Sequence, residues 1–177
     1  MSDKRKKSLI TKSIIIVALI VIVDQISKHF IRIKFPINSS IKIIDGFFNI
    51  VNVTNRGIAF GMLERFSMNQ SKAFILITII SIGILFYFYI GFLRGPNHNT
   101  FIVYTLSAII GGAIGNFIDR LFLGYVTDFF LVYYKNFTWP AFNVADTFIS
   151  IGAVSLIIFI IFEPEPKKEI INGESNA

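Results

Sequence analysis

Residues 71–93 read SKAFILITIISIGILFYFYIGFL, a run in which Lys72 is the one charged side chain. A helix needs about 20 apolar residues to cross the hydrocarbon core of a bilayer, and this run is long enough. Three further segments, residues 11–33, 100–123 and 143–162, have the same character. The sequence therefore predicts a mainly α membrane protein built on a bundle of four transmembrane helices.

The composition supports one integral membrane domain over residues 1–177. Hydrophobic residues make up 54% of the chain and charged residues 16%, which is too apolar for an ordinary soluble domain. There is no cysteine, so disulfides, thiolate metal sites and a cysteine nucleophile are excluded. His29 and His98 lie on different segments without metal-ligand spacing, and we expect neither metal nor cofactor.

Basic residues predict the orientation in the membrane. They crowd the N-terminal tail, the loop at residues 94–99 and the tail at 164–177, so by the positive-inside rule both termini are cytoplasmic. Because the positive charge collects there and does not interleave with exposed aromatics, we expect no nucleic-acid partner. The C-terminal tail is rich in Pro, Glu and Lys and is predicted to be disordered.

A cleavable signal peptide is the alternative interpretation of the N-terminus, since a basic region precedes an apolar run. However, residues 24–28 read DQISK where a cleavage site with small residues would be expected. We interpret the segment as an uncleaved first helix.

Two external segments carry their own patterns. Residues 41–61 contain short apolar runs broken at Asp45-Gly46, a hairpin signal that predicts a small antiparallel β-sheet on the outer surface. A loop packed on the helices is the alternative. Residues 124–141 are rich in Phe and Tyr and are predicted to lie along the membrane interface. We expect these to be two separate elements that face each other as a clamp.

Asp128 and Asp146 lie at the edges of long apolar segments. Ionisable groups are costly at membrane depth, and the predicted topology places both on the outer rim. Two carboxylates that share a proton can activate water while they polarise a carbonyl. The structural alternative is that Asn143 and Asp146 form the capping box of the fourth helix while Asp128 faces water.

Other polar residues converge on the same rim. Asp24 and Lys28 have the i, i+4 spacing of an intrahelical ion pair. Asn116, Asp119 and Arg120 share one face of the third predicted helix, where they can tie helices together or take part in chemistry. Small residues at four-residue spacing on this helix predict close packing: Ala108, Gly111, Gly112 and Gly115.

Five blocks in one order carry a resemblance: DQISK at residues 24–28, NRGIAFG at 55–61, GAIGNFIDR at 112–120, VTDF at 126–129 and FNVAD at 142–146. In these blocks the chain resembles the lipoprotein signal peptidases, the bacterial signal peptidase II family. They extend over nearly the whole predicted membrane domain.

The resemblance implies an aspartyl endopeptidase of the bacterial cytoplasmic (inner) membrane, with four membrane helices and an active site near the outer leaflet. It implies that diacylglyceryl prolipoproteins are the substrates and are cleaved before the lipidated cysteine. No metal or cofactor is implied, and we expect a monomer whose other partner is membrane lipid. The site residues carried over are the catalytic pair Asp128 and Asp146, the substrate-binding or supporting residues Asn55, Asn116, Arg120 and Asn143, and the structural residues Asp24, Lys28 and Asp119.

A small transporter or proton-coupled channel is the alternative from another class. It would place acidic groups at several depths and break its helices on both sides of the membrane. This chain concentrates its polar groups near one side. A non-catalytic membrane scaffold would have no use for two aspartates at the rim.

Overall fold

The computed structural model describes residues 3–57, 69–95 and 99–162. Its elements in chain order are α1 (Asp3–Lys34), β1 (Ser40–Ile44), β2 (Phe48–Asn55), α2 (Asn69–Arg94), α3 (Thr100–Leu123), β3 (Val126–Tyr134), β4 (Phe137–Thr138) and α4 (Val144–Phe162). The four helices are each long and apolar enough to cross a membrane. The predicted mainly α membrane fold with a small antiparallel sheet is confirmed.

The helix α3 is the centre of the bundle, since it packs on α1, α2 and α4. Its small residues permit this close approach. A Cβ on Gly112 would lie 2.5 Å from the carbonyl oxygen of Ala145, and one on Gly111 would lie 3.2 Å from Cβ of Ile20. The close packing predicted from the spacing of small residues is therefore present, with α4 on one face of α3 and α1 on another.

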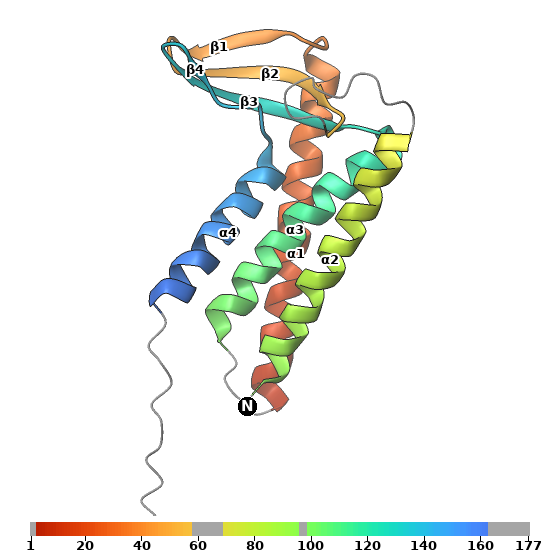
Figure 1. The fold of residues 1–177 in the computed structure, drawn as a ribbon, viewed down its shortest axis with the longest axis vertical. Helices are drawn as coiled ribbons and strands as arrows, with labels where there is room; N and C mark the ends of the chain where they lie inside the picture. Colours follow the sequence, from red (N-terminus) through yellow and green to blue (C-terminus); the bar gives the residue numbers. More distant parts are fainter. Residues whose placement is uncertain (1–2, 58–68, 96–98, 163–177) are drawn as a thin grey trace, which may run out of the picture.

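The sheet lies across one end of the bundle, and α1 begins and α4 ends at the other end (Figure 1). The first helix begins at Asp3, earlier than residue 11, because the basic residues before the apolar run are themselves helical. Lys and Arg have good helix propensity, and an acidic residue in the first turn complements the helix dipole. The predicted disordered tail lies outside the described residues.

The sheet has the order β1-β2-β3-β4 with antiparallel neighbours. The predicted hairpin at Asp45-Gly46 is confirmed, and Gly46 has φ 75, a left-handed conformation that glycine adopts without strain. Residues 58–61, the end of the predicted β segment, lie outside the described part of the chain.

The aromatic segment at residues 124–141 is not a separate clamp element, so that prediction is wrong. It forms β3 and β4, and β3 pairs with β2 from Phe48↔Val132 to Asn55↔Val126. An edge strand presents unpaired backbone groups, and a segment rich in Phe, Tyr and Val has high strand propensity. Both external segments therefore form one continuous sheet, which carries Asp128 on β3.

Candidate active site

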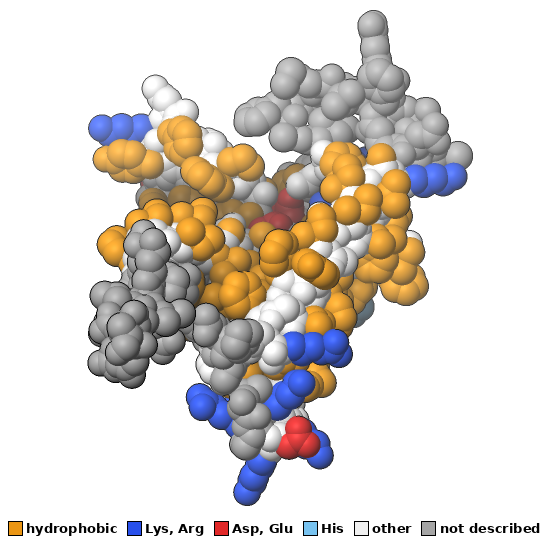
Figure 2. Space-filling view, turned by 60° about the horizontal axis from the view of Figure 1, so that its bottom comes forward, with side chains coloured by type: hydrophobic (Ala, Val, Ile, Leu, Met, Phe, Trp, Pro, Cys, Tyr) orange, Lys and Arg blue, Asp and Glu red, His pale blue; other side chains and the backbone are white. Residues whose placement is uncertain are grey.

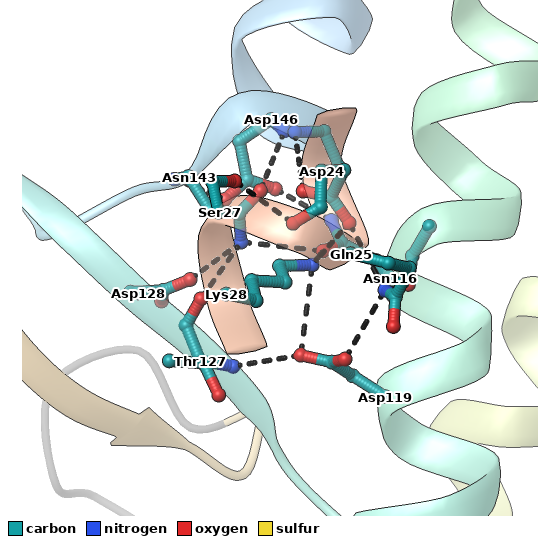
Figure 3. Close-up of polar contacts among 12 residues, drawn as sticks. Asp24, Gln25, Ser27, Lys28, Asn116, Asp119, Thr127, Asp128, Asn143 and Asp146 are labelled. Atoms are coloured by element: carbon teal, nitrogen blue, oxygen red, sulfur yellow. Dashed lines mark hydrogen bonds and ion pairs between the residues drawn. The ribbon is translucent and has the colours of Figure 1, made fainter. Parts of the chain in front are cut away.

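Polar side chains from α1, α3, β3 and the start of α4 meet where the bundle joins the sheet (Figure 3). Most of the residues predicted from the sequence are linked there by hydrogen bonds or ion pairs: Asp24, Lys28, Asn55, Asn116, Asp119, Asp128, Asn143 and Asp146. Six of these side chains are buried: Asp24, Lys28, Asn116, Asp119, Asp128 and Asn143.

The start of α4 holds Asp146 in a capping box. The Oδ1 of Asn143 accepts from the backbone N–H of Asp146 at 2.9 Å, and Oδ2 of Asp146 accepts from the backbone N–H of Asn143 at 3.2 Å. This reciprocal pair satisfies two donors that the first turn leaves free. The other carboxylate oxygen of Asp146 accepts from Nδ2 of Asn116 at 2.7 Å. Asp146 thus caps the helix and also faces α3.

The carboxylate of Asp128 is 1% exposed, so the alternative that it faces water is wrong. One oxygen accepts from Nδ2 of Asn55 at 2.9 Å and the other from Nδ2 of Asn143 at 2.7 Å. The pKa of Asp128 is raised to about 6, mainly by burial and also by the negative charge of Asp146, although the amide hydrogen bonds lower it. Asp128 therefore keeps its proton to a pH well above that of an ordinary aspartate.

Asn143 joins the two carboxyl groups. Its side-chain amide donates to Asp128, and its backbone N–H donates to Asp146. A single buried residue therefore sets the relative position of two carboxyl groups that come from β3 and α4. The negative charge of Asp146 is close enough to act on Asp128.

Lys28 fixes the orientation of Asn116, the side chain that donates to Asp146. Its Nζ lies 2.8 Å from Oδ2 of Asp24, the ion pair that the i, i+4 spacing predicts, and 3.6 Å from Oδ2 of Asp119. It also donates to Oδ1 of Asn116 at 2.8 Å. Because this cation holds the oxygen of Asn116, the amide nitrogen of Asn116 points to Asp146.

Asp24 and Asp119 each hold the backbone next to one of the two candidate catalytic aspartates. The Oδ1 of Asp24 accepts from the N–H of Ala145 at 2.9 Å, and Oδ2 of Asp119 accepts from the N–H of Thr127 at 3.0 Å. Hydrogen bonds to ionised groups are stronger than neutral ones. The buried charges of α1 and α3 therefore anchor both the start of α4 and β3.

Arg120 provides positive charge at this site. It is half-buried on α3 and interacts electrostatically with Asp146 and Asp128, yet it forms no direct ion pair with any residue that the structure describes. Its guanidinium can therefore bind a substrate oxygen while it stabilises nearby negative charge. Within the described ranges, no three His, Cys, Asp or Glu side chains are grouped so as to hold a metal ion.

Residues 16–162 match the family model described as signal peptidase (SPase) II. The chain belongs to the signal peptidase II family. It is 36% identical to a lipoprotein signal peptidase of Syntrophus aciditrophicus (strain SB) over 87% of this chain and 94% of that protein. A lipoprotein signal peptidase of Staphylococcus aureus (strain JH9) is also 36% identical, with 93% of this chain and 96% of that protein covered.

Two solved structures of bacterial membrane enzymes share the fold of this signal peptidase. One superposes with a TM-score of 0.76 at 35% identity and covers 90% of this chain and 93% of the other. The second has a TM-score of 0.74 at 34% identity, over 88% and 96% of the two chains. The protein is therefore a multi-pass membrane protease that removes signal peptides from prolipoproteins, and the transporter alternative is excluded.

Three residues of the signal peptidase site were not singled out from the sequence. Nε2 of Gln25 donates to Oδ1 of Asp119 at 3.2 Å, and Arg32 donates to Oγ1 of Thr127 at 3.1 Å. Arg32 is four residues after Lys28 and lies on the same helical face, a signal that could have revealed it. Thr127 offered no such signal, because its role depends on the pairing of β3.

A hollow on the surface of the molecule reaches acidic side chains. In Figure 2, acidic side-chain atoms are visible deep in a hollow whose sides are hydrophobic. An apolar surround excludes water and strengthens the electrostatic interactions inside.

Proposed function

We propose that Asp128 and Asp146 form the catalytic pair of this signal peptidase and that it cleaves just before a cysteine that carries diacylglycerol. The observation that carries the proposal is the hydrogen bonding of Asn143 to both carboxyl groups, one on β3 and one on α4. The arrangement brings two acidic groups together in an apolar region, where they can hold one proton between them.

The two aspartates have unequal environments, and this supports different roles. Asp128 is buried, with a pKa raised to about 6, and is the acid that holds the shared proton. Asp146 lies in the first turn of α4, where the helix dipole favours a negative charge, and is the base. These roles describe the state that starts the reaction.

The reaction needs one water molecule and no covalent enzyme intermediate. Asp146 accepts a proton from the water as its oxygen attacks the carbonyl carbon of the scissile bond, and Asp128 donates its proton to the carbonyl oxygen. The tetrahedral diol then collapses: the C–N bond breaks, one hydroxyl proton returns to Asp128, and Asp146 gives its proton to the leaving amine. The pair ends in the protonation state from which it began.

Neighbouring polar residues position the reacting groups. Asn55 and Asn143 hold the two oxygens of Asp128, and Asn116 holds Asp146. We assign Arg120 to the carbonyl oxygens of the substrate, because its guanidinium is near the pair and has no carboxylate partner among the described residues. Asp24, Lys28 and Asp119 are the structural support for this arrangement.

An apolar groove beside the site supports the lipidated substrate. It has a volume of about 500 Å³ and lies between α1 and the sheet, with Phe30, Phe35, Ile50 and Phe129 among its lining residues. Phe129 follows Asp128 directly in β3, so a lipid chain in this groove would hold its cysteine next to the pair. Substrate would enter sideways from the outer leaflet. In this orientation both termini would lie on the cytoplasmic side, and the enzyme would act as a monomer.

The test uses purified protein and a synthetic prolipoprotein in two forms, one with diacylglyceryl cysteine and one with the unmodified cysteine. Mass spectrometry of the products should show cleavage of the lipidated form at the bond before the cysteine. The unmodified form should remain intact or react far more slowly, since it cannot fill the groove. Equal cleavage of both forms, or cleavage at another bond, would contradict the proposal.

A further inference from the structure

A second cavity lies on the helices at the end away from the sheet. It has a volume of about 520 Å³, within the range of small-molecule sites, and is formed by α1, α2 and α3. Its lining residues are mostly apolar and include Ile14, Val17, Ile82, Phe86 and Ile90. In the described part of the bundle, α2 packs on α3 but scarcely on α1, so this cavity replaces a direct contact between α1 and α2.

One polar group in the cavity has no partner. Ser13 lines the cavity and is 2% exposed, and its hydroxyl makes no hydrogen bond to any described residue. Ser107, which also lines the cavity, donates to the carbonyl oxygen of Val103 at 2.7 Å. A buried hydroxyl without a partner is destabilising, and the hydroxyl of Ser13 is closed to solvent, so rotation of this short side chain toward the cavity would let an oxygen acceptor of a ligand satisfy it.

Positive charge stands at the mouth of the cavity. Lys6 and Lys7 precede Ile10 by four and three residues and therefore continue the face of α1 that Ile10, Ser13 and Val17 present to the cavity. Lys and Arg side chains gather at this end of the molecule (Figure 2). At 1.5 Å per residue, Ser13 lies roughly 10 Å deeper than these lysines, a little more than the thickness of one headgroup layer.

We propose that this cavity binds one anionic phospholipid from the leaflet on the side where α1 begins. Its phosphate pairs with Lys6 and Lys7, its ester carbonyl accepts from Ser13, and its acyl chain fills the space between α1 and α2. Under the proposed orientation this is the cytoplasmic leaflet. The lipid is separate from the substrate, because the cavity lies at the opposite end of the bundle from Asp128.

The test is native mass spectrometry of the purified full chain in detergent, titrated with phosphatidylglycerol or with phosphatidylcholine. The wild-type protein should retain one phosphatidylglycerol and should bind phosphatidylcholine more weakly. Replacing both Lys6 and Lys7 with Gln should weaken retention by about fivefold for each lysine, because a basic residue near an anionic surface has that effect. The matched control is Lys12→Gln, since Lys12 lies on the opposite face of α1 and should leave retention unchanged.

Two further variants probe the cavity itself. Ala18→Trp places a large side chain in the cavity and should abolish the one-to-one adduct, while Ser13→Ala should weaken it by about two- to tenfold, the effect of one hydrogen bond. Cleavage of a prolipoprotein by each variant shows that it is folded. Equal retention of both lipids by the wild-type protein, or an equal loss in Lys12→Gln, would overturn the proposal, and so would an unchanged adduct in folded Ala18→Trp.

Discussion

Replacing Asp128 with asparagine removes the proposed acid while the size and shape of the side chain stay the same. Asparagine cannot carry the proton that the carbonyl oxygen of the substrate receives. We expect the cleavage rate to fall by about 10² to 10⁴, the usual contribution of general acid-base catalysis. The double variant with Asp146→Asn should be little worse, because the two residues act as a unit.

The structure predicts that this variant folds. The rise in the pKa of Asp128 from an ordinary 3.8 to about 6 means that its ionised form destabilises the fold by about 3 kcal/mol at pH 7. Asparagine removes that cost but offers one acceptor oxygen to the two donors Asn55 and Asn143, a loss of about 1–3 kcal/mol. The free energy of unfolding should therefore lie between the wild-type value and about 2 kcal/mol above it.

The raised pKa of Asp128 also predicts how the stability and the cleavage rate depend on pH. A carboxyl group whose pKa is raised on folding contributes stability below its ordinary pKa of 3.8, and this contribution is lost as the pH rises through about 6. As the pH rises from 3.8 to above 6, the free energy of unfolding of the wild-type protein should thus fall by up to about 3 kcal/mol relative to that of Asp128→Asn. The cleavage rate of the wild-type protein should fall above about pH 6, as Asp128 loses its proton.

The assay combines single-turnover cleavage of a lipidated prolipoprotein with thermal unfolding of the same detergent-purified samples at several pH values. Asp45→Asn is the matched control, because Asp45 is 86% exposed on the sheet and pairs with Lys42 away from the site. This control should change neither the cleavage rate nor the thermal unfolding of the protein. Cleavage by folded Asp128→Asn within a fewfold of the wild-type rate would refute the assigned role.

Three other substitutions test the support of Asp146, the packing of α3 on α4 and the orientation of the protein in the membrane. Asn116→Ala removes the amide that donates to Asp146 and should slow cleavage by about tenfold to a hundredfold with substrate binding retained, as measured in separate binding and single-turnover assays; an unchanged rate would contradict its role. Gly112→Ala should cost about 1–3 kcal/mol in thermal unfolding because its Cβ would meet a carbonyl oxygen of α4, whereas the control Gly91→Ala meets open space and should not destabilise the protein. Asn136→Cys adds the chain's one cysteine at an exposed turn of the sheet, and a membrane-impermeant thiol reagent should label it on intact cells; labelling only after lysis would reverse the orientation.

Features that depend on neighbours in the chain could be predicted from the sequence. Four apolar runs of bilayer length predict four helices, because a helix satisfies its own backbone hydrogen bonds in lipid. The spacing of Asn143 and Asp146 predicts the capping box, and that of Asp24 and Lys28 predicts their ion pair, since each contact spans one helical turn. The five sequence blocks indicated the family.

Contacts between distant segments were decided only by the tertiary structure. The pairing of β2 with β3 places Asn55 against Asp128 across 73 residues of sequence, and Asp24 reaches the backbone of Ala145 across 121 residues. The aromatic composition of residues 124–141 suited a membrane interface and a strand equally well. The segment forms the strand β3 because its backbone pairs with the free backbone groups of β2, which a surface loop would leave to water. That pairing buries Asp128 and brings it to Asn143, and the burial raises its pKa, which no local pattern in the chain could show.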